Sequence, residues 1–106
     1  MTITAAMNSA ASGMFAQQSR LAATADNIAN ALSTGYDRRD TRMTTSSTGG
    51  VTATAVSSHT VDETANVDLG EDMLSLIETE IAFKANASAF ETGADLWDVL
   101  MSIKRD

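Results

Sequence analysis

Large apolar side chains recur every seven residues in two separate stretches of this chain. The first series is Met7, Met14, Leu21 and Ile28, and the second is Leu69, Leu76, Phe83, Phe90 and Trp97. Such a spacing places the residues along one line of an α-helix and is typical of helices that pack side by side with coiled-coil geometry. We therefore predict two long helices, over residues 3–32 and 69–104, and interpret the two series as an assembly interface.

The predicted helices are too long for a compact globule. At 1.5 Å per residue they would span about 45 and 54 Å, whereas a compact domain of this size has a radius of gyration of about 13 Å. The prediction is a mainly α fold, an elongated antiparallel coiled-coil hairpin formed by residues 1–35 and 67–106. Asp68 and Glu71 fit a capping pair at the start of the second helix.

Residues 36–66 differ in composition from both helical stretches. They are rich in Thr, Ser, Val and Gly, with Gly49 and Gly50 near the centre. Val51, Ala53 and Ala55 alternate with threonines, which favours a β-hairpin that turns at residues 48–50. A flexible loop is the alternative that the composition leaves open.

The first predicted helix carries almost no charge. Residues 3–32 contain ten alanines. The charged side chains among residues 1–36 are only Arg20 and Asp26. A helix that faces water usually shows a charged face. We infer that this helix is surrounded by other helices. One chain cannot supply enough of them, so the sequence indicates an assembly.

Several classes of function find no support in the sequence. The net charge of −7 is a poor match for nucleic acid, and we interpret the small basic cluster Arg38, Arg39 and Arg42 as a solvated or salt-bridged surface. No apolar run approaches the ~20 residues of a membrane span. The N-terminus lacks the basic and apolar regions of a secretory signal, so we expect neither membrane insertion nor a cleaved signal peptide.

The candidate chemical groups do not form a recognisable catalytic or metal site. There is no cysteine, and His59, the one histidine, is interpreted as a surface residue. Asp62, Thr64, Asn66 and Asp68 alternate as in a calcium loop, but Val67 and Met73 stand where that loop requires glycine and an acid. We expect no cofactor, no metal and no enzymatic activity.

The segment "LAATADNIANALSTGY", Leu21 to Tyr36, resembles the N-terminal signature of the bacterial flagellar axial proteins, the basal-body rod and hook proteins. The matching residues are Asn27, Ile28, Ala29, Asn30, Thr34, Gly35 and Tyr36. The C-terminal half is similar to the closing helix of the same family, most clearly at residues 66–69, 85–87 and 103–105. This chain differs from the common pattern at Asp26, Leu32, Phe83 and Lys84, and its middle segment is short.

The resemblance implies an α-helical domain built from both termini and stacked helically into a tube. It further implies partners among copies of this chain and other rod and hook proteins. The implied route is the flagellar export apparatus, without a cleaved signal peptide, to the periplasm-spanning rod of the basal body. The short middle segment favours a rod-type subunit. The alternative is a soluble helical adaptor or export-associated protein that binds one axial partner through the same coiled-coil face.

The corner formed by Asn27, Asn30, Thr34, Gly35 and Tyr36 has a structural interpretation and a functional one. Structurally, Gly35 would allow a positive φ at a helix C-terminus, while the asparagines satisfy nearby backbone groups. Functionally, the corner would redirect the chain from the inner tube to an outer layer, and the asparagines would also bond to a neighbouring subunit. The two interpretations are compatible.

Overall fold

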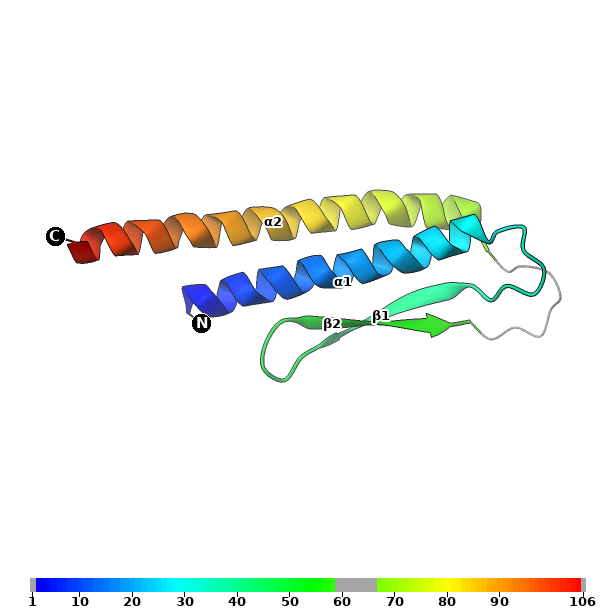
Figure 1. Cartoon of the computed structure of the whole chain (residues 1–106), viewed down its shortest axis with the longest axis horizontal. Coiled ribbons are helices and arrows are strands. Elements are labelled where there is room, and N and C mark those ends of the chain that lie inside the picture. Colours follow the sequence, from blue (N-terminus) through cyan, green and yellow to red (C-terminus); the bar gives the residue numbers. More distant parts are fainter. Residues whose placement is uncertain (1, 59–66, 106) are drawn as a thin grey trace.

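The computed structural model describes residues 2–58 and 67–105, which form two long helices and a β-hairpin. The elements are α1 (Ile3–Ala29), β1 (Arg39–Thr45), β2 (Val51–Ser57) and α2 (Leu69–Arg105). The helices lie antiparallel, and the hairpin runs along the side of α1 that faces away from α2 (Figure 1). The predicted mainly helical fold with two long helices is confirmed, and the middle segment contains the hairpin rather than a loop alone. His59, Asp62, Thr64 and Asn66 lie outside the described residues.

The three parts lie side by side rather than stacked in layers. The backbone measures 68 × 26 × 14 Å, with a radius of gyration of 18.2 Å. Since one helix with its side chains is about 10–12 Å across, the molecule is a plank that is one element thick. In the described part, neither strand lies within backbone contact distance of α2, so α1 lies between α2 and the hairpin.

Helix α1 begins at a capping threonine and ends earlier than the sequence pattern predicts. The Thr2 hydroxyl accepts a hydrogen bond from Ala5 N at 3.1 Å. The helix ends at Ala29 instead of residue 32, with Asn30 as the C-cap. The Asn30 amide donates to Asp26 O at 2.9 Å and accepts from the Ser33 hydroxyl at 3.1 Å. This side chain offers the backbone an alternative to further helical bonds, which explains the early end.

The hairpin pairs its two strands over seven residues each, from Arg39 opposite Ser57 to Thr45 opposite Val51. Its turn needs Gly49 and Gly50, whose φ angles are +95° and +85°. The turn end is fixed to α1, because Val51 N donates to the Ser12 hydroxyl at 3.0 Å. The hairpin therefore folds back along α1 instead of projecting from the end of the molecule.

Helix α2 begins with the cap that the sequence predicts and is longer than its partner. Asp68 Oδ1 accepts from Glu71 N at 3.1 Å. Its 37 residues correspond to about 55 Å, against about 40 Å for the 27 residues of α1. The start of α1 and the end of α2 lie at the same end of the molecule, and the C-terminal part of α2 extends beyond the start of α1 (Figure 1).

The core between these elements consists of small residues. Every buried apolar residue in the described part is an alanine, namely Ala10, Ala16 and Ala23. Gly13 lies so close to Asn86 of α2 that an added Cβ would lie 2.7 Å from Asn86 Cγ, and at Gly93 it would lie 2.6 Å from Met7 Cγ. The helices therefore approach closely at glycines and alanines, and Met7 is the member of the seven-residue series that packs directly onto such a glycine.

Candidate assembly site

The corner after α1 turns the chain back by two successive bends. Asn30 O accepts from Ser33 N at 2.9 Å, and Ser33 O accepts from Tyr36 N at 3.2 Å. The second bend places Gly35 at its third position with a φ of +76°, as a type II turn requires. The predicted positive φ of Gly35 is present, but it belongs to this separate turn and not to the helix C-terminus. Thr34 and Gly35 are both exposed.

Asn27 is the hydrogen-bonding centre of the corner. Its side chain is 1 % exposed and holds both backbone groups of Arg39, accepting from N and donating to O at 2.8 Å each. It also accepts from the Tyr36 hydroxyl at 2.9 Å and lies 3.5 Å from Asp72 Oδ1. Burial raises the pKa of the Tyr36 phenol, and the Asp26 carboxylate raises it further, so this hydroxyl remains a donor.

Because all polar groups of Asn27 bond within the chain, this side chain presents nothing to a neighbouring subunit in this conformation. Asn30, which is half-buried, is the asparagine for which an intersubunit bond stays a prediction. The predicted role of both asparagines in satisfying nearby backbone groups agrees with the bonds from Asn27 to Arg39 and from Asn30 to Asp26.

Two arginines connect the corner to the helices on either side. Arg38 donates to Glu71 at 2.9 Å and to the buried Asp72 at 3.2 Å, whereas Arg39 pairs with Asp26 of α1 at 3.0 Å. These ion pairs confirm the salt-bridged interpretation of Arg38 and Arg39. The start of α2 is thereby attached to the chain segment between α1 and the hairpin.

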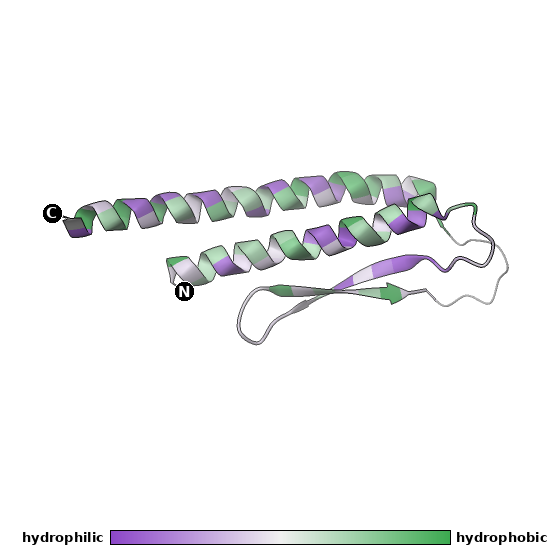
Figure 2. Cartoon of the chain, in the orientation of Figure 1, coloured by the Kyte–Doolittle hydropathy of each residue, from purple (hydrophilic) through white to green (hydrophobic). Residues whose placement is uncertain are grey.

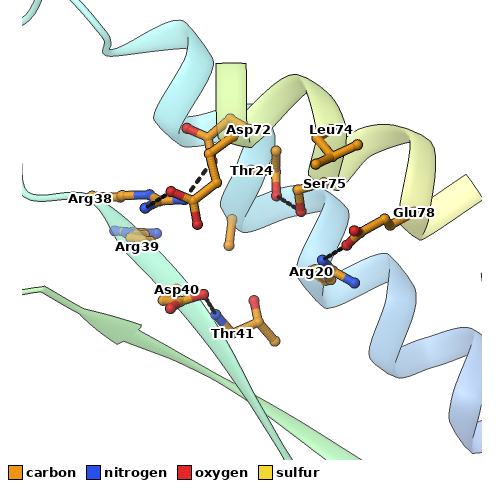
Figure 3. A pocket seen from close by; sticks show the side chains of 12 residues that line it. Arg20, Thr24, Arg38, Arg39, Asp40, Thr41, Asp72, Leu74, Ser75 and Glu78 are labelled. Atoms are coloured by element: carbon orange, nitrogen blue, oxygen red, sulfur yellow. Dashed lines mark hydrogen bonds and ion pairs between the residues drawn. The ribbon is translucent and has the colours of Figure 1, made fainter. Parts of the chain in front are cut away.

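A polar cavity of about 230 Å³ lies beside these ion pairs. Figure 3 shows its walls, in which Arg20 pairs with Glu78, Thr24 bonds to Ser75, and Arg38 pairs with Asp72. The α1–α2 contact at this end of the molecule is therefore made by polar side chains. Where a coiled coil would have apolar residues between its helices, this contact consists of Arg20, Thr24, Ser75 and Glu78.

The residues of the two seven-residue series all retain exposed surface. Leu21, Leu69, Phe90 and Trp97 are exposed, and the others, Met7, Met14, Ile28, Leu76 and Phe83, are partly exposed. The contact between the two helices therefore buries the two series only in part. Glycine, alanine, serine and threonine contribute the rest of that contact. The role of the series in contacts between subunits stays a prediction.

Three members of the series gather in one groove. Leu21 of α1 and Leu76 and Phe83 of α2 line a mainly apolar groove of about 460 Å³ that runs between the helices on one broad face. Its rim carries glutamines on α1 and the Glu80–Lys84 ion pair on α2. An apolar floor with a polar rim is the usual composition of a helix-binding groove.

The C-terminal overhang of α2 exposes several large apolar side chains, interspersed with polar and charged residues. Contacts between the helices run from Asn27–Asp72 at the corner to Met7–Gly93, so residues after about 97 pass the start of α1 (Figure 1). In this overhang the exposed large residues are Trp97, Val99, Leu100, Met101 and Ile103, with Trp97 48 % and Ile103 65 % exposed. Figure 2 shows hydrophobic residues at this end of α2.

Sequence reasoning missed two features of the site. The Arg38–Asp72 pair joins residues 34 positions apart, and nothing in the local pattern connects them. The close approaches at Gly13 and Gly93 are a second omission, although a glycine within a helical pattern can indicate close packing of a neighbouring element. No described helix is long and apolar enough to cross a membrane. Residues 2–58 and 67–105 contain no cluster of three or more metal-binding side chains.

Comparison with known proteins places the corner within a family signature. Residues 7–36 match the sequence model of the family described as "Flagella basal body rod protein". Over 43 residues, or 41 % of the chain, the sequence is 40 % identical to the flagellar hook protein FlgE of Rhizobium meliloti. Over the same length it is 37 % identical to that of Brucella suis and 44 % identical to that of Brucella abortus. The matched region covers 11 % of each hook protein.

Proposed function

We propose that this chain, which belongs to the flagellar axial family of rod and hook proteins through its N-terminal segment, is a structural subunit that assembles helically through its two terminal helices. The observation that carries the proposal is which apolar residues the chain buries and which it leaves exposed. The buried apolar residues of the described chain are alanines, while large apolar residues remain exposed on both helices.

The energetics favour assembly over a stable isolated chain. Fully burying a Leu, Ile, Phe or Met side chain contributes about 1.5–3 kcal/mol, and this chain buries none of them completely in its described part. Leu21, Phe90 and Trp97 each keep between about a third and half of their surface exposed. Burying the remainder against neighbouring subunits would contribute roughly 1 kcal/mol per side chain.

The shape of the chain suits a tube wall. A plank with a thickness of 14 Å has two broad faces that no part of the described chain covers. The groove of Leu21, Leu76 and Phe83 opens on one such face, and the overhang of α2 extends from the end of the plank. A groove and an overhang on different parts of one chain favour head-to-tail contacts, which generate open helical assemblies instead of closed pairs.

We further propose a rod-type subunit, because only the short hairpin segment separates α1 from α2 and because the matching family is that of rod proteins. The proposed partners are copies of the chain, other rod and hook proteins, and the flagellar export apparatus. The proposed location is the periplasm-spanning rod of the basal body, reached without a cleaved signal peptide. The role is structural, without catalysis or a cofactor.

The test compares Leu21→Asp with Leu21→Met in the full chain. Leucine to methionine conserves volume and apolar character, whereas a carboxylate buried in the groove would cost several kcal/mol or force its protonation. Polymer formation is measured by sedimentation and electron microscopy. We expect the aspartate variant to lose polymers and the methionine variant to keep them.

Two outcomes contradict the proposal. Polymers of normal amount from Leu21→Asp would show that the groove is not an interface. A wild-type chain that forms a closed dimer or small oligomer and grows no further at high concentration would support the adaptor alternative instead.

A further inference from the structure

The register of the hairpin determines which backbone groups point away from it. The bonded pairs at its two ends are Arg38 with Ser58 and Ser46 with Gly50, at N–O distances of 2.8 and 3.0 Å. In antiparallel strands, bonded and non-bonded pairs alternate. The odd-numbered residues of both strands therefore direct their N–H and C=O groups outward, to the two edges of the ribbon.

The outer edge of β1 is occupied where it begins. The Asn27 side chain holds both outward groups of Arg39, and Thr41 N donates to the Asp40 carboxylate at 2.9 Å. Arg42 adds a further charge to the same strand. Charged side chains and covered backbone groups are the means by which proteins block strand addition at a sheet edge.

The outer edge of β2 has no charged side chain, and α1 covers it only near its start, beside Val51 and Ala53. Its sequence, "VTATAVS", contains no charge and no proline, and Figure 2 shows the contrast with the hydrophilic β1. Val51 N bonds to Ser12, but the outward groups of Ala53, Ala55 and Ser57 have no partner within residues 2–58 and 67–105. At the corner end, β2 forms the border of the plank that lies opposite α2 (Figure 1). An uncharged open edge of this kind is a template for another strand.

We infer that this edge pairs with β2 of a second copy of the chain. An antiparallel pair centred on Ala55 places Ala55 opposite itself and Ala53 opposite Ser57, so each outward group of these three residues finds a partner. The result is a four-stranded sheet in the order β1-β2-β2-β1 about a two-fold axis. The pairing satisfies more of the open edge than β1 of another copy would, because that strand is already covered at Arg39 and Thr41.

The charge distribution favours the same partner. Residues 69–105 of α2 carry seven acidic against three basic side chains, whereas β1 and β2 together carry two arginines and one aspartate. A contact through β2 keeps the two acidic helices on opposite outer borders of the pair. Like-charge repulsion between copies is therefore smaller in this arrangement than in a contact that brings the two α2 helices together.

A two-fold contact joins two chains into a closed dimer. The inferred dimer is therefore a state of the chain apart from an open helical assembly. The inference does not rest on the proposed axial function. Its test uses a different edge of the molecule from the Leu21 variants, so the two proposals fail separately.

The test uses disulfide formation, because the chain contains no cysteine of its own. In the inferred register two copies of Ala55→Cys face each other with Cα atoms about 5.5 Å apart, which a disulfide spans. Ala53→Cys alone is the matched control, since its two copies lie about 13 Å apart, four residues along the strand. The double variant Ala53→Cys with Ser57→Cys restores facing pairs.

We expect disulfide-linked dimers from Ala55→Cys and from the double variant under mild oxidation, and at least about tenfold fewer from Ala53→Cys. Adding Ala55→Pro to the double variant removes one outward N–H without affecting the bonds between β1 and β2, so the dimers should be lost while the hairpin remains. The hairpin is checked by NMR.

The inference is overturned if Ala55→Cys forms no more dimer than Ala53→Cys, or if the dimers survive Ala55→Pro. It is also overturned if mixed copies of Ala55→Cys and Met43→Cys are linked preferentially, because that product reports pairing of β2 with β1.

Discussion

Replacing Asn27 with aspartate should destabilise the fold more than removing the side chain does. Asn27→Ala loses three bonds of 2.8–2.9 Å, to the Tyr36 hydroxyl and to both backbone groups of Arg39. At about 1 kcal/mol for each bond, the loss is about 3 kcal/mol. Asn27→Asp keeps the two bonds that the side-chain oxygen accepts, from the Tyr36 hydroxyl and from Arg39 N. It replaces the donor to Arg39 O by an oxygen, so two oxygens face each other there. It also brings a second carboxylate to about 3.5 Å from Asp72.

The magnitude of the second effect follows from that distance. Two unit charges at 3.5 Å repel by about 5 kcal/mol at an effective dielectric constant of about 20. Arg38 and Arg39 offset part of this, but both already pair with acids. The repulsion also raises the pKa of the introduced carboxyl group above the ~3.9 of an unfolded chain.

The sign of the pH dependence follows from this raised pKa. A carboxyl group whose pKa is higher in the folded state destabilises the fold as it ionises. The loss of folding stability that ionisation causes in Asn27→Asp is therefore absent below about pH 4, and it grows as the pH rises above that value. The loss of folding stability in Asn27→Ala does not depend on pH in this way, because alanine does not ionise.

Thermal unfolding followed by circular dichroism, at fixed protein concentration between pH 4 and pH 8, measures both deficits. We expect the melting temperature of Asn27→Asp to fall relative to Asn27→Ala as the pH rises. Equal melting temperatures for the two variants across this range would refute the reasoning, because they would mean that Asp72 and position 27 are not close neighbours in a buried site.

Two further predictions concern glycines. Gly35→Val should reduce polymer formation while leaving helix content nearly unchanged, because a β-branched residue at a φ of +76° costs about 1–3 kcal/mol. Circular dichroism and sedimentation of this variant and of Gly35→Asn, which tolerates positive φ, provide the check, and normal valine polymers would identify an ordinary loop glycine. Gly70→Ala, in the first turn of α2, should stabilise the chain by up to about 1 kcal/mol through helix propensity, because its Cβ would meet only Asp68 Oδ1 at 3.4 Å. Gly93→Ala should not, because its Cβ would lie 2.6 Å from Met7 Cγ and such overpacking costs about 1–3 kcal/mol. Equal gains for both alanine variants in urea titrations would contradict the close approach.

The elements themselves could be predicted from the sequence because their signals are local. The seven-residue spacing identified both helices, Asp68 identified the start of α2, and the alternation around Val51 favoured the hairpin. The early end of α1 was missed because Asn30 bonds back to Asp26, a choice that the apolar spacing does not reveal.

The packing could not be predicted because it contradicts the usual rule for large apolar residues. Spacing shows that Leu76 and Phe83 share a face, but not whether that face meets the same chain or another one. The position of the hairpin along α1 depends on the contact of Asn27 with Arg39 and of Ser12 with Val51, which join residues 12 and 39 positions apart. Nothing in the spacing of the sequence specifies such contacts.

The central claim is that this chain needs neighbouring subunits to complete its hydrophobic packing. The most direct measurement is helix content by circular dichroism over a dilution series, with the mass measured by sedimentation at each concentration. The account predicts that helicity and mass fall together on dilution, because Ala10, Ala16 and Ala23 are the only buried apolar residues of the described chain. Full helicity at nanomolar concentration, with the mass of a monomer, would contradict it.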